Sequence, residues 1–427
     1  MDTIFALASA PGRSGVAVVR VSGDRSWEAV KALAGSVPEP RRMVLRTLRD
    51  TSGAHVDKAM VVVFAAGASF TGEESAEFHL HGSIAVVRAI LLELSLLEGC
   101  RPAQPGEFTR RALENGCMDF TQVEALADLI EAETEGQRKQ ALAVLSGALS
   151  GRVSEWRQKL VRAASLLEVT IDFVDEDVPV DVAGEVVGLL KDVLSDIQAE
   201  LRGLDAAERV RMGFEVAIVG PPNAGKSTLL NNLAGRDAAI TSEIAGTTRD
   251  VIEVRMDVGG LPVTFLDTAG LRETEDPVER LGIDLARRRA EAADLRVHLV
   301  ERGGQPEIGV RSGDVVRWAK DDSGSLDDGL SGRTGYGVAR VLSEIAEELL
   351  ERTAGMSLTS RERHRDSLVR SQMFLERAVS GLESGMSEVD ILSEDIRLGI
   401  RQLEILVGRV EVEHLLDEIF SSFCIGK

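Results

Sequence analysis

The segment from Gly220 to Ser227 reads G-P-P-N-A-G-K-S and matches the pattern G-x-x-x-x-G-K-[ST]. Small residues let successive backbone N–H groups wrap around a phosphate, and the first turn of a following helix adds a favourable field. Lys226 is expected to reach the β and γ phosphates of a nucleotide, and Ser227 to ligate Mg²⁺. An apolar strand pattern, FEVAIV, precedes the segment, and a helical pattern follows it. We therefore predict a triphosphate-binding loop, whose contacts are Asn223, Ala224, Gly225, Lys226, Ser227 and Thr228.

Two further motifs follow in the order of a nucleotide-dependent switch. A-G-T-T-R-D supplies the pair Thr247 and Thr248 about twenty residues after the loop, and D-T-A-G begins at Asp267 after VTFLD. An aspartate at a strand end can hold Mg²⁺ through water, and a following glycine lets the backbone approach a γ phosphate. Alone, D-T-A-G is also compatible with an ordinary turn. In this order the set predicts a GTPase domain, with Thr248 as second Mg²⁺ ligand and with nucleotide contacts from Thr247, Asp267, Thr268, Ala269 and Gly270.

The residue that many GTPases use to orient water is absent. Leu271, not glutamine, follows D-T-A-G. The Asn223 carbonyl, inside the phosphate loop, is placed to help hold a monovalent cation, which would supply the positive charge that an arginine finger provides elsewhere. Glu279, in DPVERLGI, is a candidate for orienting water indirectly. From spacing alone, a solvated helix carboxylate explains Glu279 equally well.

Base selection normally uses N-K-x-D, whose final aspartate accepts hydrogen bonds from guanine. The best match is Ala319-Lys320-Asp321-Asp322 after DVVRW, with Ala319 in place of asparagine. A later segment, Ser331 to Gly335, reads S-G-R-T-G and resembles a degenerate second base loop. We predict a preference for guanine through Lys320 and Asp322.

Composition limits the remaining possibilities. The 427 residues include 49 Lys+Arg and 70 Asp+Glu, for a formal charge of −21. Residues 1–120 hold 13 basic and 14 acidic residues, so nearly all of the excess negative charge lies in the rest of the chain. This disfavours broad coating of nucleic acid, and such a partner would need a local basic patch or a helper protein. Three cysteines without C-x-x-C, no secretory signal and no apolar run of about 18 residues predict a cytoplasmic protein without a membrane span.

Periodicity predicts the elements that position these residues. Short β-branched runs alternate with helical stretches from Thr3 to about Gly116, a long helical pattern follows from Thr121, and strand–turn–helix units begin at Phe214. Helical periodicity returns from about Thr359 to Phe420. The predicted fold class is multidomain α/β and all-α. It comprises a small α+β domain at 1–118, a discontinuous helical domain at 119–212 and 357–427, and an inserted P-loop (Ras-like) GTPase α/β domain at 213–356.

Taken together, these motifs and elements show that the chain resembles the MnmE (TrmE) family of bacterial tRNA modification GTPases over nearly its whole length. The segments that carry the resemblance are APGRSGVAVVRVSG, SFTGEESAEFHLHGS, PGEFTRRALENGCMDFTQVEALADLI, GPPNAGKSTLLNNLAGRDAAITSEIAGTTRDVIE, DTAGLRETEDPVERLGI and the terminal FSSFCIGK. The GTPase motifs are shared by many families, whereas the N-terminal segments and the C-I-G-K end are far more specific.

The resemblance implies an N-terminal domain that forms a homodimer and binds 5-formyltetrahydrofolate as a one-carbon donor. The matching positions are Arg20, Glu77 and Lys427, and Cys117 stands where the family pattern N-G-K-[LM]-D carries lysine. The resemblance also places Cys424 near the folate as a nucleophile or proton carrier, while a packed structural thiol remains an equal alternative. His79 and His81 alternate on one strand, which favours structural histidines over a metal pair.

The resemblance further implies activation by K⁺, with Glu279 as the catalytic, water-orienting carboxylate. The expected K⁺ ligands are Asn223, Ser242, the Ile244 carbonyl and Thr247, and Ser242 also counts among the nucleotide contacts.

The resemblance also implies a flavoprotein partner, MnmG, which would carry FAD and use NADH. This partner would form a heterotetramer with the chain and provide much of the contact with tRNA. The expected product is a carboxymethylaminomethyl or aminomethyl group on C5 of wobble uridine 34. Two alternatives remain open at this point: an Era-type GTPase switch in RNA or ribosome assembly, and a folate-binding protein with a vestigial nucleotide domain. The first predicts a basic KH-like module after the GTPase domain, where this chain returns to acidic helices.

Overall fold

The computed structural model describes residues 2–172, 182–236, 238–240, 253–267, 288–384, 389–409, 420 and 426. Contacts within the chain group it into two compact units, residues 1–127 with 404–427, and residues 128–403. The three predicted domain boundaries stay predictions. Among the described helices, none combines the length and apolar character that a membrane crossing requires.

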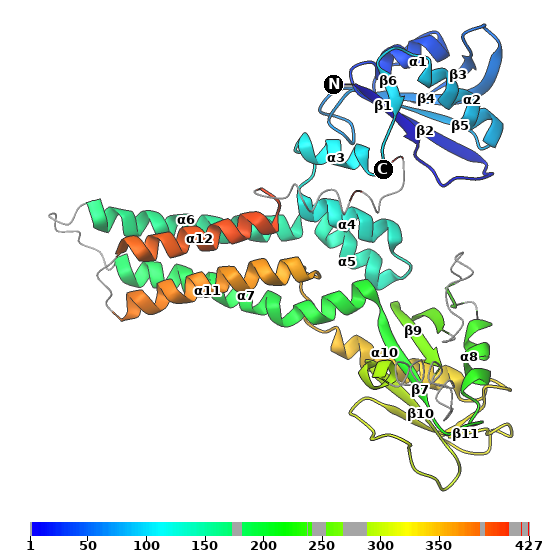
Figure 1. Ribbon diagram of the computed structural model, residues 1–427, viewed down its shortest axis with the longest axis vertical. Helices are drawn as coiled ribbons and strands as arrows, with labels where there is room; N and C mark the ends of the chain where they lie inside the picture. Colours follow the sequence, from blue (N-terminus) through cyan, green and yellow to red (C-terminus); the bar gives the residue numbers. More distant parts are fainter. Residues whose placement is uncertain are drawn as a thin grey trace, which may run out of the picture. The chain divides into compact units, whose positions relative to one another are not determined.

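The first unit is built on a six-stranded sheet in the order β3-β4-β5-β2-β1-β6 (Figure 1). Neighbouring strands are antiparallel except β1 and β6, which are parallel. The strands are β1 (Thr3–Leu7), β2 (Val16–Ser22), β3 (Val44–Arg49), β4 (His55–Phe64), β5 (Ser75–His81) and β6 (Cys100–Pro102). The helices of this part of the chain are α1 (Ser26–Ala34), α2 (Ile84–Ser95), α3 (Glu107–Glu114) and α4 (Phe120–Glu131).

Strand alternation separates the two faces of this sheet. Every second residue, such as Val19, Val21 and Phe78, is buried in one apolar core with α1 and α2. Phe108 of α3 packs instead in a separate small cluster with Ile4 and Ala6 of β1. The residues between the core positions, including Arg20 and Glu77, consequently lie away from α1 and α2.

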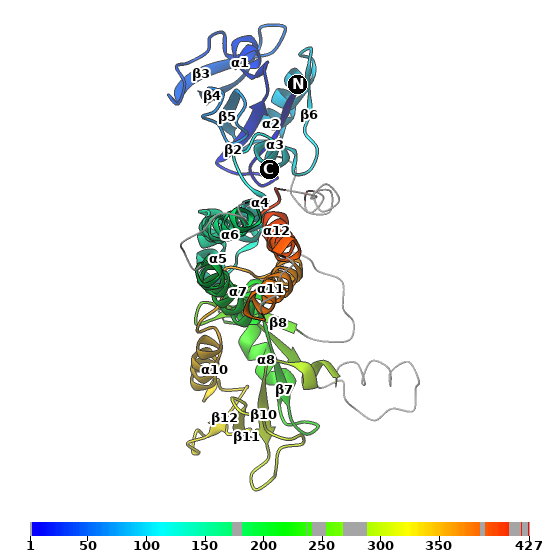
Figure 2. The ribbon, with the colours of Figure 1, turned by 90° about the vertical axis from the view of Figure 1, so that its left-hand side faces the viewer.

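The second unit contains a helical body made from segments far apart in the sequence. Figure 2 shows α6, α7, α11 and α12 nearly end on and side by side. The Trp156 indole donates to Asp196 at 3.0 Å between α6 and α7, and the Ser371 hydroxyl donates to the Gly399 carbonyl at 3.1 Å between α11 and α12. The helices are α5 (Glu135–Leu145), α6 (Ala148–Asp172), α7 (Val182–Met212), α11 (Glu362–Glu383) and α12 (Val389–Leu406).

An α/β sheet lies between α7 and α11 in the sequence. Its order is β12-β11-β10-β7-β9-β8, with every neighbouring pair parallel except β8 and β9. The strands are β7 (Phe214–Val219), β8 (Glu253–Val258), β9 (Leu261–Asp267), β10 (Leu295–Val300), β11 (Val315–Ala319) and β12 (Gly329–Leu330). The described helices α8 (Lys226–Ala234) and α10 (Val338–Arg352) cover one face through their buried leucine, isoleucine and valine side chains.

Hydrogen bonds join the inserted sheet to the helical body. The Gly136 N–H at the start of α5 donates to the Gly260 carbonyl in the β8–β9 turn at 2.8 Å. The Gln137 side chain donates to the Arg211 carbonyl at 2.9 Å, near the end of α7. On the return path, the buried Glu200 carboxylate accepts the Leu358 N–H at 3.1 Å. Residues of α7 therefore form hydrogen bonds at both places where the chain passes between the helical body and the sheet.

These observations confirm the predicted fold class of an α+β domain, a discontinuous helical domain and an inserted P-loop α/β domain. The fold class could be predicted because the spacing of apolar residues changes between about two, in strands, and about 3.6, in helices, along the chain.

Phe78→Ala tests whether the sheet–helix core is the main source of stability in the first unit. Phe78 is fully buried, so its truncation should lower the free energy of unfolding of that unit by about 3–5 kcal/mol. The matched control Leu92→Ala, at a position 61% exposed on α2, should change it by less than about 0.5 kcal/mol. Urea unfolding followed by hydrogen exchange within residues 1–127 is the measurement. Equal effects of the two variants would contradict this assignment of the core.

Candidate functional site: a nucleotide pocket

The phosphate loop leaves the carboxyl end of β7 through residues that permit unusual backbone angles. Gly220 has φ +159°, and a Cβ there would lie 2.5 Å from the Leu299 carbonyl oxygen of β10. Gly225, with φ +100°, is the N-cap of α8, and Asn223 is left-handed with φ +65°. Asparagine tolerates this region better than most residues. The two glycines are thus required by the loop's shape.

Lys226 lies folded over this loop. Its Nζ donates to the carbonyl oxygen of Gly220 and, at 3.1 Å, to that of Pro221. The side chain is only 6% exposed. Burial lowers the pKa of Lys226, an effect that Glu307 and Asp267 oppose through their negative charge. A bound phosphate would act in the same direction as these carboxylates and favour the charged amine.

Ser227 and Asp267 meet although they come from different motifs. The Ser227 hydroxyl donates to Asp267 Oδ2 at 2.7 Å, from the first turn of α8 to the end of β9. Hydroxyl and carboxylate oxygens are ligand types that Mg²⁺ prefers. This pair therefore fits the predicted magnesium site.

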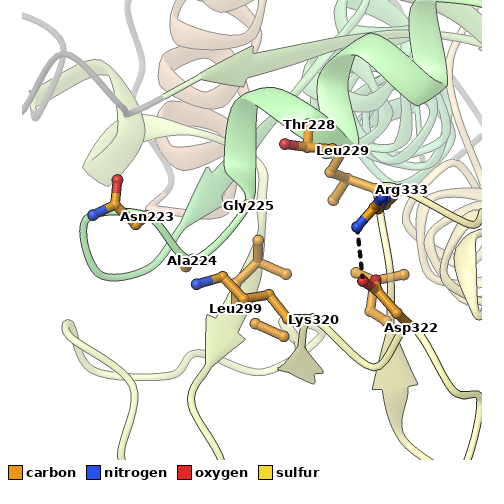
Figure 3. Close-up of a pocket in the computed structure, with 12 residues that line it drawn as sticks. Asn223, Ala224, Gly225, Thr228, Leu229, Leu299, Lys320, Asp322 and Arg333 are labelled. Carbon is orange, nitrogen blue, oxygen red and sulfur yellow. Dashed lines mark ion pairs between the residues drawn. The ribbon is translucent and has the colours of Figure 1, made fainter.

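A pocket of about 200 Å³ connects the phosphate loop with the predicted base loop (Figure 3). It lies at the carboxyl ends of β7, β10 and β11, between strands where the sheet order reverses, which is the usual ligand position in α/β sheets. Its lining residues are Asn223, Ala224, Gly225, Thr228, Leu229, Leu299, Ala319, Lys320, Asp322, Leu330, Gly332 and Arg333. Two loops separated by almost a hundred residues thus form one site.

The base loop is organised by Asp321, whose neighbour Asp322 stays at the pocket rim. Asp321 is buried and accepts the Leu326 N–H at 2.9 Å and the Ser323 hydroxyl at 2.9 Å. Burial acts to raise the pKa of Asp321, but hydrogen bonds from Leu326, Ser323 and Ser325 outweigh it and hold the pKa below its ordinary value. Asp322 is 48% exposed and lines the pocket. The first aspartate is structural and the second is available to a ligand.

The S-G-R-T-G segment fixes the other wall. The Ser331 hydroxyl donates to Asp322 Oδ1 at 2.6 Å and accepts the Thr334 N–H at 3.1 Å. Gly332 approaches α8 so closely that a Cβ would lie 2.5 Å from the Leu229 backbone nitrogen. Ser331, Gly332 and Arg333 were not among the predicted contacts, although the S-G-R-T-G resemblance was the signal that identified their segment.

The first unit brings two of the predicted folate residues together. Arg20 on β2 and Glu77 on β5 are direct cross-strand neighbours, and Arg20 Nε donates to Glu77 Oε1 at 3.0 Å. The Arg20 guanidinium also lies over the rings of Phe70 and Phe108, at 5.2 and 5.7 Å from their centroids. Aromatic faces beside a guanidinium–carboxylate pair suit a planar heterocycle that carries donors and acceptors.

Cys117 is a free, exposed cysteine. A Cβ on Gly72 would lie 2.8 Å from its sulfur, so the thiol is packed directly against that glycine. His79 contacts Glu77 at 3.3 Å and His81 contacts Asp57 at 2.7 Å. In the part of the chain that the structure describes, no three His, Cys, Asp or Glu side chains gather as a metal would require.

The remaining predicted site residues lie outside the described ranges. They are Ser242, Ile244, Thr247, Thr248, Thr268, Ala269, Gly270, Glu279, Cys424 and Lys427.

Comparisons with known proteins cover the whole chain. A family model described as "GTP-binding protein TrmE N-terminus" matches residues 3–117, and one described as "MnmE helical domain" matches residues 120–424. A protein of Roseobacter denitrificans called "tRNA modification GTPase MnmE" is 55% identical over 428 residues, covering 100% of both chains. A protein of the same name from Cereibacter sphaeroides (strain ATCC 17029) is 58% identical over 432 residues, again covering 100% of both.

Asp322→Asn tests the base-reading register. In the predicted contact the Asp322 carboxylate would accept from the two donors of guanine, whereas an amide at this position can instead donate to the extra oxygen of xanthine. The variant should lose at least about tenfold in GTP affinity and gain affinity for xanthosine triphosphate. Competition binding with the two nucleotides measures this, and Asp327→Asn, exposed in the same loop, is the control. An unchanged preference would place the base contact elsewhere.

Proposed function

Because the chain belongs to the MnmE family of tRNA modification GTPases, we propose that it hydrolyses GTP to drive C5 modification of wobble uridine 34 in certain tRNAs. The observation that carries this proposal is that the phosphate loop and the base loop line one common pocket. The two relatives called "tRNA modification GTPase MnmE" match along their entire length, so the similarity extends well beyond the motifs common to GTPases. This favours the tRNA-modification function over an Era-type assembly switch.

We propose the following arrangement of the nucleotide. The loop amides and the positive end of α8 receive the phosphates, Lys226 leaves its carbonyl partners for the β and γ oxygens, and Asp322 accepts from guanine. Ser227, Thr248 and, through water, Asp267 would hold Mg²⁺, which neutralises charge that develops on the phosphates. The 2.7 Å contact between Ser227 and Asp267 supports this assignment.

A K⁺ ion is the proposed substitute for an arginine finger. Its ligands would be Asn223, Ser242, the Ile244 carbonyl and Thr247, and Glu279 would orient the attacking water. Asn223 lies within the phosphate loop and lines the pocket, which supports its part in this set.

For the modification chemistry we propose a 5-formyltetrahydrofolate site around Arg20 and Glu77, completed by Lys427, with Cys117 at the lysine position of the family pattern. The support is the paired guanidinium and carboxylate beside Phe70 and Phe108. Cys424 would act there as the thiol of the uridine reaction.

We propose a homodimer that assembles with the flavoprotein MnmG into a heterotetramer, where the partner carries FAD, oxidises NADH and provides much of the tRNA contact. The formal charge of −21 supports this division, because an acidic chain gains little from the tRNA phosphates by itself.

Replacing Na⁺ by K⁺ at constant ionic strength should raise GTP turnover of the purified chain about tenfold or more, equivalent to at least about 1.4 kcal/mol of transition-state stabilisation. The physical reason is that Na⁺ is smaller than K⁺ and holds its hydration water more tightly, so it exchanges that water for the proposed oxygen ligands less readily. Steady-state phosphate release at saturating GTP is the measurement, so that differences in affinity do not contribute. Equal rates in the two salts would remove the K⁺ proposal while leaving GTP hydrolysis intact.

A further inference from the structure

Guanine presents two different edges to a protein, and the pocket has an evident partner for only one of them. Its N1–H and 2-amino groups are donors, whereas O6 and N7 are acceptors. Asp322, an acceptor, suits the first edge. Ala319, at the position where N-K-x-D carries an asparagine, offers no polar side chain to the second. The acceptor edge therefore lacks the side-chain donor that an asparagine at this position would supply.

The polar lining residues differ in where they point. Asn223 and Thr228 belong to the phosphate loop and the first turn of α8. Figure 3 shows the Lys320 side chain extending toward Ala224 of the phosphate loop. Arg333, in contrast, turns its guanidinium toward Asp322, with 4.0 Å between Arg333 Nη1 and Asp322 Oδ2. Arg333 is thus the donor that lies beside the base-reading carboxylate.

Hydrogen bonds hold the backbone around Arg333, whereas its side chain is exposed. The Ser331 N–H donates to the Tyr336 carbonyl at 3.0 Å, and the Gly335 N–H donates to the Ser331 carbonyl at 2.9 Å, which closes the turn. Gly332 is packed against the backbone of α8 at Leu229. The Arg333 side chain itself is 83% exposed, and its ion pair in the described chain is the long one to Asp322. A base that enters the pocket meets little competition for this guanidinium.

We propose that Arg333 is a specificity-determining residue that donates from its guanidinium to O6 and N7 of guanine, in place of the side chain that Ala319 lacks. The planar fork of arginine matches these paired acceptors, the commonest specific contact between a side chain and guanine. Asp322 and Arg333 together then read both edges of the base. This inference deepens the proposed function and rests on GTP being the nucleotide bound.

The test removes the acceptor and the donor separately. Affinities for GTP and for 7-deaza-GTP, which has C–H at the N7 position, are measured by fluorescence competition on the full chain with Mg²⁺ and K⁺. The wild-type chain should bind 7-deaza-GTP about five- to tenfold more weakly than GTP. Arg333→Ala should bind GTP about tenfold more weakly than wild type and should no longer distinguish the two nucleotides.

Two further variants separate specific donation from charge. Arg333→Lys keeps the positive charge but loses the fork, and it should fall between wild type and Arg333→Ala in its preference for GTP. Arg311→Ala, at an exposed position outside the pocket lining, should behave as wild type.

The results against the proposal are equally definite. If wild type binds GTP but does not distinguish 7-deaza-GTP, or if Arg333→Ala keeps the wild-type ratio of affinities, Arg333 does not read N7. If Arg333→Lys equals wild type in this ratio, the residue acts only through its charge. Failure of folded wild type to bind GTP at all would overturn the proposed function, and this inference with it.

Discussion

The nucleotide pocket depends on two close backbone approaches, one of the phosphate loop to the carboxyl end of β10 and one of the second base loop to α8. A side chain at Gly220 would collide with the Leu299 carbonyl, and one at Gly332 would collide with the backbone at Leu229. Because α8 follows the phosphate loop directly, these two approaches hold the phosphate loop and the second base loop next to each other. With larger residues at either point the phosphate-binding and base-reading halves would separate, so the absence of a Cβ is a requirement for forming one site.

The polar groups of the site then follow from their positions on that framework. Lys226 and Ser227 occupy the first turn of α8, where backbone N–H groups favour anions, and Asp267 ends the neighbouring β9. The β8–β9 hairpin lies between the segments that carry the two predicted switch motifs. The turn of this hairpin accepts a hydrogen bond from Gly136 of α5. A displacement of the hairpin would therefore act directly on the helical body through this bond. This is a short physical route for the proposed coupling between nucleotide and the larger modifying complex.

Much of this could be predicted from the sequence because the responsible signals are local. The P-loop pattern, the aspartate at the end of VTFLD and the change from strand to helix periodicity each involve neighbouring residues. Ser331 and Arg333 were harder to predict, because their roles arise when a turn about a hundred residues after the phosphate loop packs on α8. Likewise Phe70 and Phe108 reach Arg20 only through the pairing of distant strands. In A-K-D-D, the motif predicts the second aspartate as the base contact, and the structure places that residue in the pocket lining. Nothing in the motif indicates that the first aspartate organises the loop.

The central claim is that GTP bound at this pocket drives modification of tRNA. Its most direct test is mass analysis of wobble nucleosides in tRNA from cells that lack this gene and carry either the wild-type chain or Lys226→Ala. The account predicts that the wild-type chain restores the C5-modified uridines, whereas the variant, expressed and folded at the same level, leaves them unmodified. Full modification in cells with Lys226→Ala would contradict the claim.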